Sequence, residues 1–195
     1  MGKKFNSIDI LTNGFSIGLA NFVSLLGAAV LWLLTCWIPY INIGTTIAMA
    51  TLPIEMAKGK VFSPLSIFDK KYFSLMGEFF LTFGFMYLGV LIGTIFLFTP
   101  GIVISIAWSL SLLLLIDKKL NPMESITASN KATTGYKWII FLAQLLLGIA
   151  LCILFAIFSR IPYLGTVLCF ALVLIIIPVA LGMQAFIYKK LCLEE

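Results

Sequence analysis

The chain has 195 residues, of which 62% are hydrophobic and only 11% are charged, and its mean hydropathy is +1.13. Soluble domains contain about 45–50% apolar and about 25% charged residues, so this composition excludes a soluble globular fold. The net charge of +5 does not indicate a nucleic-acid partner, because the lysines flank apolar runs in small groups instead of forming a basic groove with stacking aromatic residues. The composition predicts an all-α integral membrane protein in which residues 1–195 form one domain.

Six apolar runs have about the length of a transmembrane helix, which needs about 20 apolar residues. They are 16–38, 41–57, 74–98, 101–116, 138–158 and 163–188. Pro39, Pro100 and Pro162 mark the short turns between the runs of each pair, and proline suits a turn or a first helical position because it has no backbone N–H. We expect six transmembrane helices in three antiparallel hairpins, although the second and fourth runs are short for a complete crossing.

Basic residues fall on one side of this arrangement. All twelve lysines lie on the face that carries both termini, and Arg160 is the only basic residue opposite. Lysine and arginine accumulate in the cytoplasmic loops of membrane proteins. The expected location is therefore the cell inner (plasma) membrane, with several crossings and with both termini in the cytoplasm.

Two connections on this inner side predict short interfacial helices. One begins at Ser63-Pro64 and would place the apolar residues Leu65, Ile67, Phe68, Tyr72 and Phe73 in lipid. The other covers residues 121–135, with Asn121 as N-cap and Glu124 at the third helical position, a variant of the capping box. Gly135 is a typical C-terminal stop.

Lysines next to the apolar runs are candidates for binding lipid headgroups, because each basic residue near an anionic membrane surface contributes about 1 kcal/mol. These candidates are Lys70, Lys71, Lys118, Lys119, Lys131 and Lys137. Membrane lipids, preferentially anionic on the cytoplasmic face, are therefore expected partners, together with a membrane protein partner.

Two carboxylates are candidate functional residues within the membrane. An ionisable group inside a span is a functional candidate by default. Glu55 lies three residues before Lys58, however, and Glu78 lies about two helical turns after Lys71. Each can therefore pair with a lysine at the interface, and we favour this structural interpretation for both.

Two pairs of small residues are candidates for helix packing. Gly89 and Gly93 form a GxxxG pattern in the third run, and this spacing lets helix backbones approach closely. Ser105 and Ser109, also four residues apart, would present a small polar face toward another helix. We expect the glycines to pack within the bundle, with self-dimerisation as the alternative.

No catalytic or cofactor-binding pattern is present. The chain has no histidine, its four cysteines form no CxxC motif, and it lacks the common nucleophile, metalloprotease and phosphate-binding motifs. Polar residues within the apolar runs, such as Asn21, Thr45, Ser111 and Gln144, are scattered along the sequence. We therefore expect no catalytic residue, no cofactor and no metal site.

The stretch from Pro100 to Gly148 has the most distinctive pattern. Its marked residues are Pro100, Gly101, Trp108, Asp117, Glu124, Ser129, Lys131, Gly135, Lys137 and Trp138. This pattern resembles an uncharacterised family of bacterial six-helix membrane proteins that is related to the membrane domain of some glycerophosphoryl diester phosphodiesterases. In those phosphodiesterases catalysis belongs to a separate soluble domain, so the resemblance implies a six-helix fold and argues against an enzyme.

Three classes of function stay open. The favoured one is a non-catalytic integral membrane protein that acts as a scaffold, an envelope-homeostasis factor or a partner-binding subunit, including an immunity-type subunit. The alternative is a small transporter or channel for an apolar or lipid-like substrate, which Pro53 and Pro178 inside the second and sixth runs favour. The third is a lipid-modifying enzyme that uses Asp117, Glu124 and Lys131.

Overall fold

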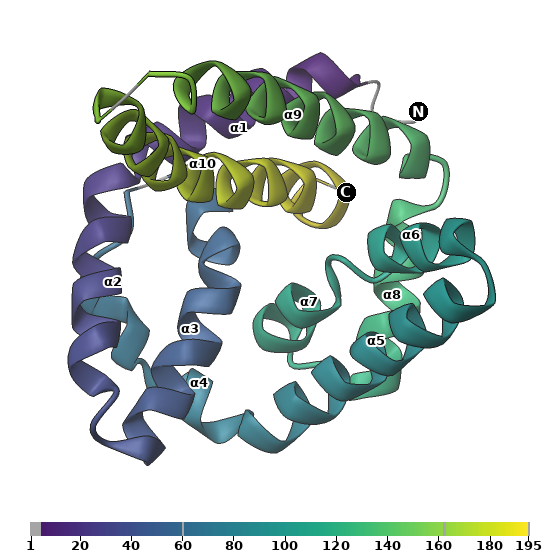
Figure 1. The fold of residues 1–195 in the computed structure, drawn as a ribbon. Helices are drawn as coiled ribbons and strands as arrows, with labels where there is room; N and C mark the ends of the chain where they lie inside the picture. Colours follow the sequence, from purple (N-terminus) through teal and green to yellow (C-terminus); the bar gives the residue numbers. More distant parts are fainter. Residues whose placement is uncertain (1–4, 60, 162, 195) are drawn as a thin grey trace.

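The computed structural model describes residues 5–59, 61–161 and 163–194, and all regular secondary structure in this part of the chain is helical. The elements in chain order are α1 (Ser7–Ala20), α2 (Phe22–Thr35), α3 (Pro39–Ala57), the 3-10 helix η1 (Pro64–Phe68), α4 (Lys70–Ser74), α5 (Met76–Phe96), α6 (Phe98–Ala107), α7 (Ser111–Lys118), α8 (Pro122–Thr133), α9 (Lys137–Phe158), α10 (Leu164–Tyr188) and the π-helical η2 (Lys189–Leu193). Figure 1 shows α1, α9 and α10 together along one edge, α2 and α3 along the next, and α5 to α8 at the opposite corner.

Four helices in the described chain are long and apolar enough to cross a membrane. They are α5, the α6–α7 pair (Phe98–Lys118), α9, and α10 continued by η2 (Leu164–Leu193). Helices α1 and α2 make a fifth candidate when they are counted as one span, although they are bent by 62°. These features are compatible with a multi-pass membrane protein of four or five apolar spans. They do not establish six spans or three hairpins.

The predicted first span, residues 16–38, is bent in the structure. The helix already begins at Ser7 and bends at Asn21, which is only 4% exposed. The Asn21 amide donates to the carbonyl of Ile17 (3.0 Å), and its Oδ1 accepts from the N–H of Phe62 (3.3 Å). The bend is therefore held by a residue 41 positions further along the chain.

The predicted second span, residues 41–57, corresponds to α3, which is not among the apolar span candidates. This helix carries several hydroxyl side chains, and they hold it to α2. The Thr35 and Thr45 hydroxyls lie 2.9 Å apart, and Trp32 Nε1 donates to Thr46 Oγ1 at 2.9 Å. Polar residues that are scattered in sequence thus meet between α2 and α3.

The predicted fourth span, residues 101–116, is interrupted at residues 108–110, between α6 and α7. The break exposes backbone groups that α8 satisfies. Ser129 Oγ donates to the carbonyl of Ala107 (2.7 Å) and accepts from the N–H of Leu110 (3.2 Å), and Thr133 Oγ1 donates to the same carbonyl (3.3 Å). Side-chain hydroxyls on neighbouring helices commonly satisfy such breaks in membrane proteins.

The predicted helix at residues 121–135 is confirmed as α8, but its position differs from a helix lying on the surface. The Asn121 side chain accepts from the N–H of Glu124 (2.9 Å), and Glu124 returns the contact in a complete capping box. Gly135 has φ +88°, as expected of a helix stop. One face of α8, including Ser129 and Thr133, is fully buried against the α6–α7 break.

The segment after Ser63 is helical as predicted, but two of its residues do not point into lipid. Ile67 in η1 and Tyr72 in α4 are both 0% exposed and belong to the core. The placement of these two side chains in lipid was therefore wrong.

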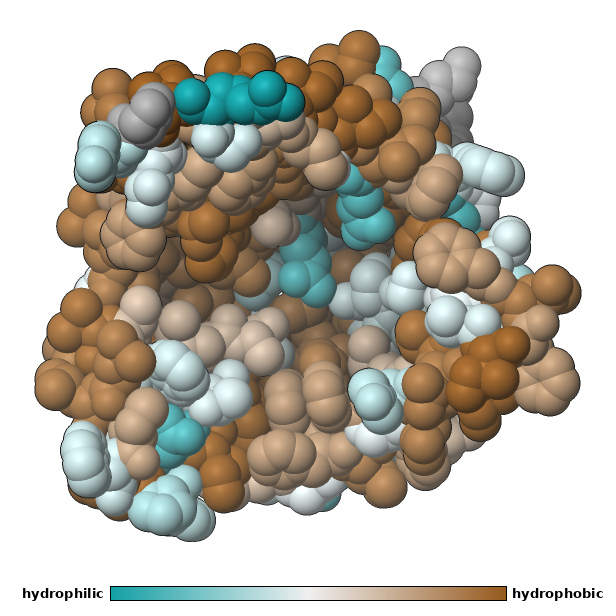
Figure 2. Space-filling view, in the orientation of Figure 1, coloured by the Kyte–Doolittle hydropathy of each residue, from teal (hydrophilic) through white to brown (hydrophobic). Residues whose placement is uncertain are grey.

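Many large apolar side chains are exposed on the surface of the molecule. Figure 2 shows them around the rim of one face, with a hollow at the centre where hydrophilic residues gather. Exposed apolar residues on α9 and α10 include Leu145, Ile149, Ile153, Val167 and Phe170. This distribution is typical of a protein surrounded by lipid, because water would not favour so many exposed apolar side chains.

Candidate functional site: a basic pocket at the ends of α7, α8 and α10

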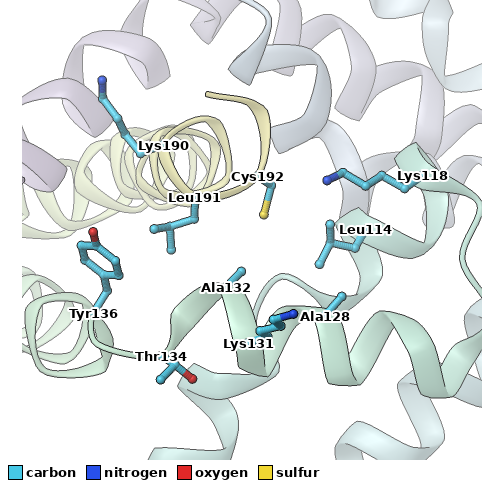
Figure 3. A pocket seen from close by; sticks show the side chains of 10 residues that line it. All are labelled: Leu114, Lys118, Ala128, Lys131, Ala132, Thr134, Tyr136, Lys190, Leu191 and Cys192. Atoms are coloured by element: carbon cyan, nitrogen blue, oxygen red, sulfur yellow. The ribbon is translucent and has the colours of Figure 1, made fainter. Parts of the chain in front are cut away.

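Three lysines from different elements line one pocket of about 470 Å³. Lys118 belongs to the last turn of α7, Lys131 to the last turn of α8, and Lys190 to η2 at the end of α10. The remaining lining residues are Leu114, Ala128, Ala132, Thr134, Tyr136, Leu191 and Cys192 (Figure 3). Helix ends thus bring together basic residues that are far apart in sequence.

The three lysines are not equivalent. Figure 3 shows Lys118 extending toward Cys192 with Lys131 across the pocket from it, whereas Lys190 extends away from both. Lys190 Nζ forms an ion pair with Glu194 at 2.7 Å. Among the described residues no carboxylate lies within 4 Å of the ammonium group of Lys118 or Lys131. These two lysines therefore supply the uncompensated positive charge of the pocket.

The wall between the lysines is apolar. Leu114 and Leu191 are buried, and Ala128 and Ala132 are half-buried. A cationic rim on an apolar wall is chemically complementary to an amphipathic anion, and basic pockets between helices on the cytoplasmic side of membrane proteins bind anionic lipid headgroups. The arrangement can therefore hold a phosphate-bearing headgroup.

A short hydrogen bond fixes the helix ends that carry these lysines. The hydroxyl of Tyr188, a fully buried residue, donates to Asp117 Oδ2 at 2.6 Å and joins the end of α10 to the end of α7. Lys118 follows Asp117 directly, so this bond positions it. The sequence does not indicate this pair, because the two residues are 71 positions apart in the chain.

The other predicted headgroup lysines lie elsewhere. Lys70 and Lys119 are exposed, and neither lines this pocket. Lys71 Nζ pairs with Glu55 at 2.8 Å. Burial is the largest single effect and lowers the pKa of Lys71, but the hydrogen bond and charge of Glu55 together with the neighbouring Tyr72 outweigh it, so the pKa is raised above its ordinary value. Lys71 is thus charged and already paired. Lys137 donates to Asn130 Oδ1 at 2.9 Å.

The two candidate carboxylates differ in their surroundings. Glu55 Oε1 accepts from Lys58 (3.0 Å), the partner that the sequence suggested, and also from Lys71 (2.8 Å), which the sequence had offered to Glu78. Glu78 is exposed in the first turn of α5, where the helix dipole favours a negative charge. No lysine in the described chain lies within ion-pair distance of Glu78.

Both candidate glycines pack against α6 in the same chain. A Cβ on Gly89 would collide with the ring of Trp108, and a Cβ on Gly93 would lie 2.9 Å from Ile104 Cδ1 and 3.2 Å from the backbone of Gly101. This face of α5 is therefore occupied within the molecule.

The paired serines do not share one contact. Ser105 is exposed and its hydroxyl donates to the carbonyl of Ile102 (2.8 Å), so it does not face another helix. The carbonyl of the half-buried Ser109 accepts from Gln184 Nε2 of α10 at 2.9 Å. Only the second serine thus lies at a helix contact.

No group of three metal-binding side chains occurs among the described residues. The chain matches no family model, no curated protein and no solved structure in the comparisons that we made. The resemblance to the six-helix membrane family therefore stays a prediction from the residues between Pro100 and Gly148.

Proposed function

We propose that this protein is a non-catalytic component of the bacterial inner membrane that acts by contact within the bilayer, as a scaffold or partner-binding subunit anchored by anionic lipid. The observation that carries the proposal is the basic pocket, where Lys118 and Lys131 lie on opposite sides of a partly apolar pocket and no described carboxylate lies within 4 Å of either ammonium group. Membership of the six-helix family is part of the same proposal.

The carboxylates support a structural role over catalysis. Glu55 pairs with two lysines, Asp117 accepts from Tyr188, and Glu124 completes a capping box. A hydrolase or transferase needs a nucleophile or metal, a base and a stabilising group in mutual reach. Acidic groups that are committed to helix ends and ion pairs are poor candidates for that work.

The pocket is tested by lipid retention. Native mass spectra of the protein in mild detergent, with equal amounts of phosphatidylglycerol and phosphatidylcholine, should show preferential retention of phosphatidylglycerol. Replacing both Lys118 and Lys131 by Gln should lower that preference by roughly 30-fold, since each basic residue contributes about 1 kcal/mol. The matched control, Lys70→Gln with Lys119→Gln, removes the same charge from exposed positions outside the pocket. Equal losses in the two double variants would contradict a specific site.

The proposed transmembrane topology is tested by thiol labelling. We propose six crossings with both termini cytoplasmic, which the lysine distribution supports. In a cysteine-free background, Arg160→Cys should react with an impermeant thiol reagent added outside intact cells, whereas Lys70→Cys should react only after permeabilisation. Both positions are exposed in the structure. Labelling of position 70 alone in intact cells would reverse the orientation.

If the protein acts by contact within the membrane, a variant that disturbs helix packing should impair function more than a variant that neutralises a carboxylate. Gly89→Leu should disturb the α5–α6 packing and reduce complementation of a strain that lacks the gene. Asp117→Asn and Glu124→Gln should leave complementation within about twofold, because an amide keeps an acceptor oxygen for Tyr188 or for the capping contact. A carboxylate-to-amide variant that folds but fails to complement would instead favour an enzyme or a transporter.

One observation favours the alternative, a small transporter or channel for an apolar or lipid-like substrate. The apolar α6–α7 span is discontinuous, and binding sites of transporters commonly form at discontinuous helices. Ser109, Gln144 and Gln184 line a second pocket of about 280 Å³ between the α6–α7 break, α9 and α10. Loss of complementation in a folded Gln144→Leu variant, with lipid retention unchanged, would select this alternative.

A further inference from the structure

A third pocket lies apart from both the basic pocket and the pocket lined by Gln144 and Gln184. It is a groove of about 470 Å³ between α6 and the start of α9. Its lining residues are Thr99, Ile102, Val103, Ile106, Gly135, Lys137, Trp138 and Phe141. Thr134 and Tyr136 line the basic pocket, whereas Gly135 and Lys137 line this groove, so the α8–α9 turn separates the two.

The wall on α6 is a single helical stripe. Thr99, Ile102, Val103 and Ile106 follow the spacing i, i+3, i+4, i+7, which places them on one face of the helix. The stripe extends along roughly 10 Å of the helix axis at about 1.5 Å per residue. On the other side of the groove, Trp138 and Phe141 pack edge to face with ring centroids 5.8 Å apart. The groove therefore offers an elongated apolar surface to an elongated apolar group.

A single cation stands at one end of the groove. Lys137 Nζ donates to Asn130 Oδ1 at 2.9 Å, which is a neutral acceptor, and no carboxylate in the described chain lies within 4 Å of it. Lys137 is also the first residue of α9, where the helix dipole adds positive potential. This end of the groove is thus complementary to an anion.

Trp138 indicates the depth of that end in the membrane. Its side chain is 81% exposed and lies next to Lys137. Tryptophan is enriched at the membrane interface, where its ring lies at the level of the headgroups. An anion beside Lys137 would therefore lie at headgroup depth, with the α6 stripe extending from it.

We propose that the α6–α9 groove binds one acyl chain of an anionic phospholipid, with the phosphate of its headgroup paired to Lys137. The charge at one end and the apolar stripe on the wall select this occupant. The inference rests on the membrane location in the proposed function, but it concerns a site separate from the basic pocket.

The test uses the full chain in phosphatidylcholine bilayers that contain acyl-brominated phosphatidylglycerol or, at the same mole fraction, acyl-brominated phosphatidylcholine. Bromine quenches tryptophan fluorescence on contact, and comparison with Trp138→Phe isolates the signal of Trp138. We expect the anionic lipid to quench Trp138 at an about fivefold lower mole fraction than the zwitterionic lipid, the factor for one basic residue near the surface.

Two variants distinguish the headgroup contact from the chain contact. Lys137→Gln should remove the fivefold preference, whereas Lys70→Gln, an equal change of charge at an exposed position, should keep it. Val103→Phe fills the groove at a partly exposed position without changing its charge, and it should weaken the preferential quenching. All three variants leave Lys118 and Lys131 intact, so lipid retention by the basic pocket is measured independently.

Several outcomes would overturn the proposal. Equal quenching of Trp138 by the two lipids, or a preference that persists in Lys137→Gln, would show that the groove does not select an anionic lipid. Quenching of Trp138 by neither lipid would show that a second copy of the chain or another membrane helix covers the groove.

Discussion

Gly182→Ala is expected to destabilise the protein by about 3 kcal/mol, at the upper end of the range for overpacking. Gly182 of α10 lies against Gly14 and Gly18 of α1, where the two backbones are in contact. A Cβ on Gly182 would overlap the carbonyl oxygen of Gly14 and lie 2.7 Å from the nitrogen of Gly18. Because both obstacles are backbone atoms, no side chain can move aside, and the helices must separate.

The matched control is Gly148→Ala. Gly148 lies in the middle of α9, and a Cβ there would meet nothing within 4 Å. Alanine has the higher helix propensity by about 0.8–1 kcal/mol, so this variant should be neutral or slightly more stable. The midpoint of thermal unfolding in mild detergent measures both changes. Equal midpoints for the two variants would mean that the α1–α10 contact does not limit stability.

The α1–α10 contact illustrates what the sequence could indicate and what it could not. The spacing of Gly14 and Gly18 marks a surface that permits close approach. It does not identify the partner, because Gly182 is an isolated glycine more than 160 residues away. The Asn121–Glu124 capping box of α8 was predictable, because the residues that form it are close together in the sequence.

Breaks in the apolar helices were not predictable in the same way. Trp108-Ser109-Leu110 contains neither glycine nor proline, so no local signal ends α6 there. The hydroxyls that compensate the break belong to α8, and Ser129 is 19 positions from Leu110. Asn21 is similar, since its contact with Phe62 depends on how the chain returns after α3. Long-range partners decide both positions.

The basic pocket was predictable only in part. From the sequence, Lys118 and Lys131 are two of six candidate headgroup lysines that cannot be ranked, because each flanks an apolar run. A tertiary contact then sets one of the six apart, because Lys71 is paired with Glu55. Which lysines carry uncompensated charge depends on the positions of a few carboxylates, and hydropathy patterns contain no information about that.

Ser129→Ala is expected to cost about 2 kcal/mol, although it removes only one oxygen atom. Ser129 Oγ is a partner of both the Ala107 carbonyl and the Leu110 N–H, within the fully buried interface of α6, α7 and α8. Thr133 still reaches the carbonyl at 3.3 Å, but the N–H of Leu110 loses its side-chain acceptor. A buried donor without a partner costs about 1–3 kcal/mol.

Ser111→Ala makes the same chemical change at the residue that directly follows Leu110, where the hydroxyl bonds no backbone group of the break. The Ser111 hydroxyl is 0% exposed and has no hydrogen-bond partner within the described chain. Its removal should leave stability unchanged or raise it slightly, because an unpaired buried hydroxyl is itself unfavourable. Unfolding midpoints compare the two variants, and amide exchange at Leu110 should accelerate only in Ser129→Ala. A larger loss from Ser111→Ala than from Ser129→Ala would mean that the hydroxyl of α8 does not hold the break.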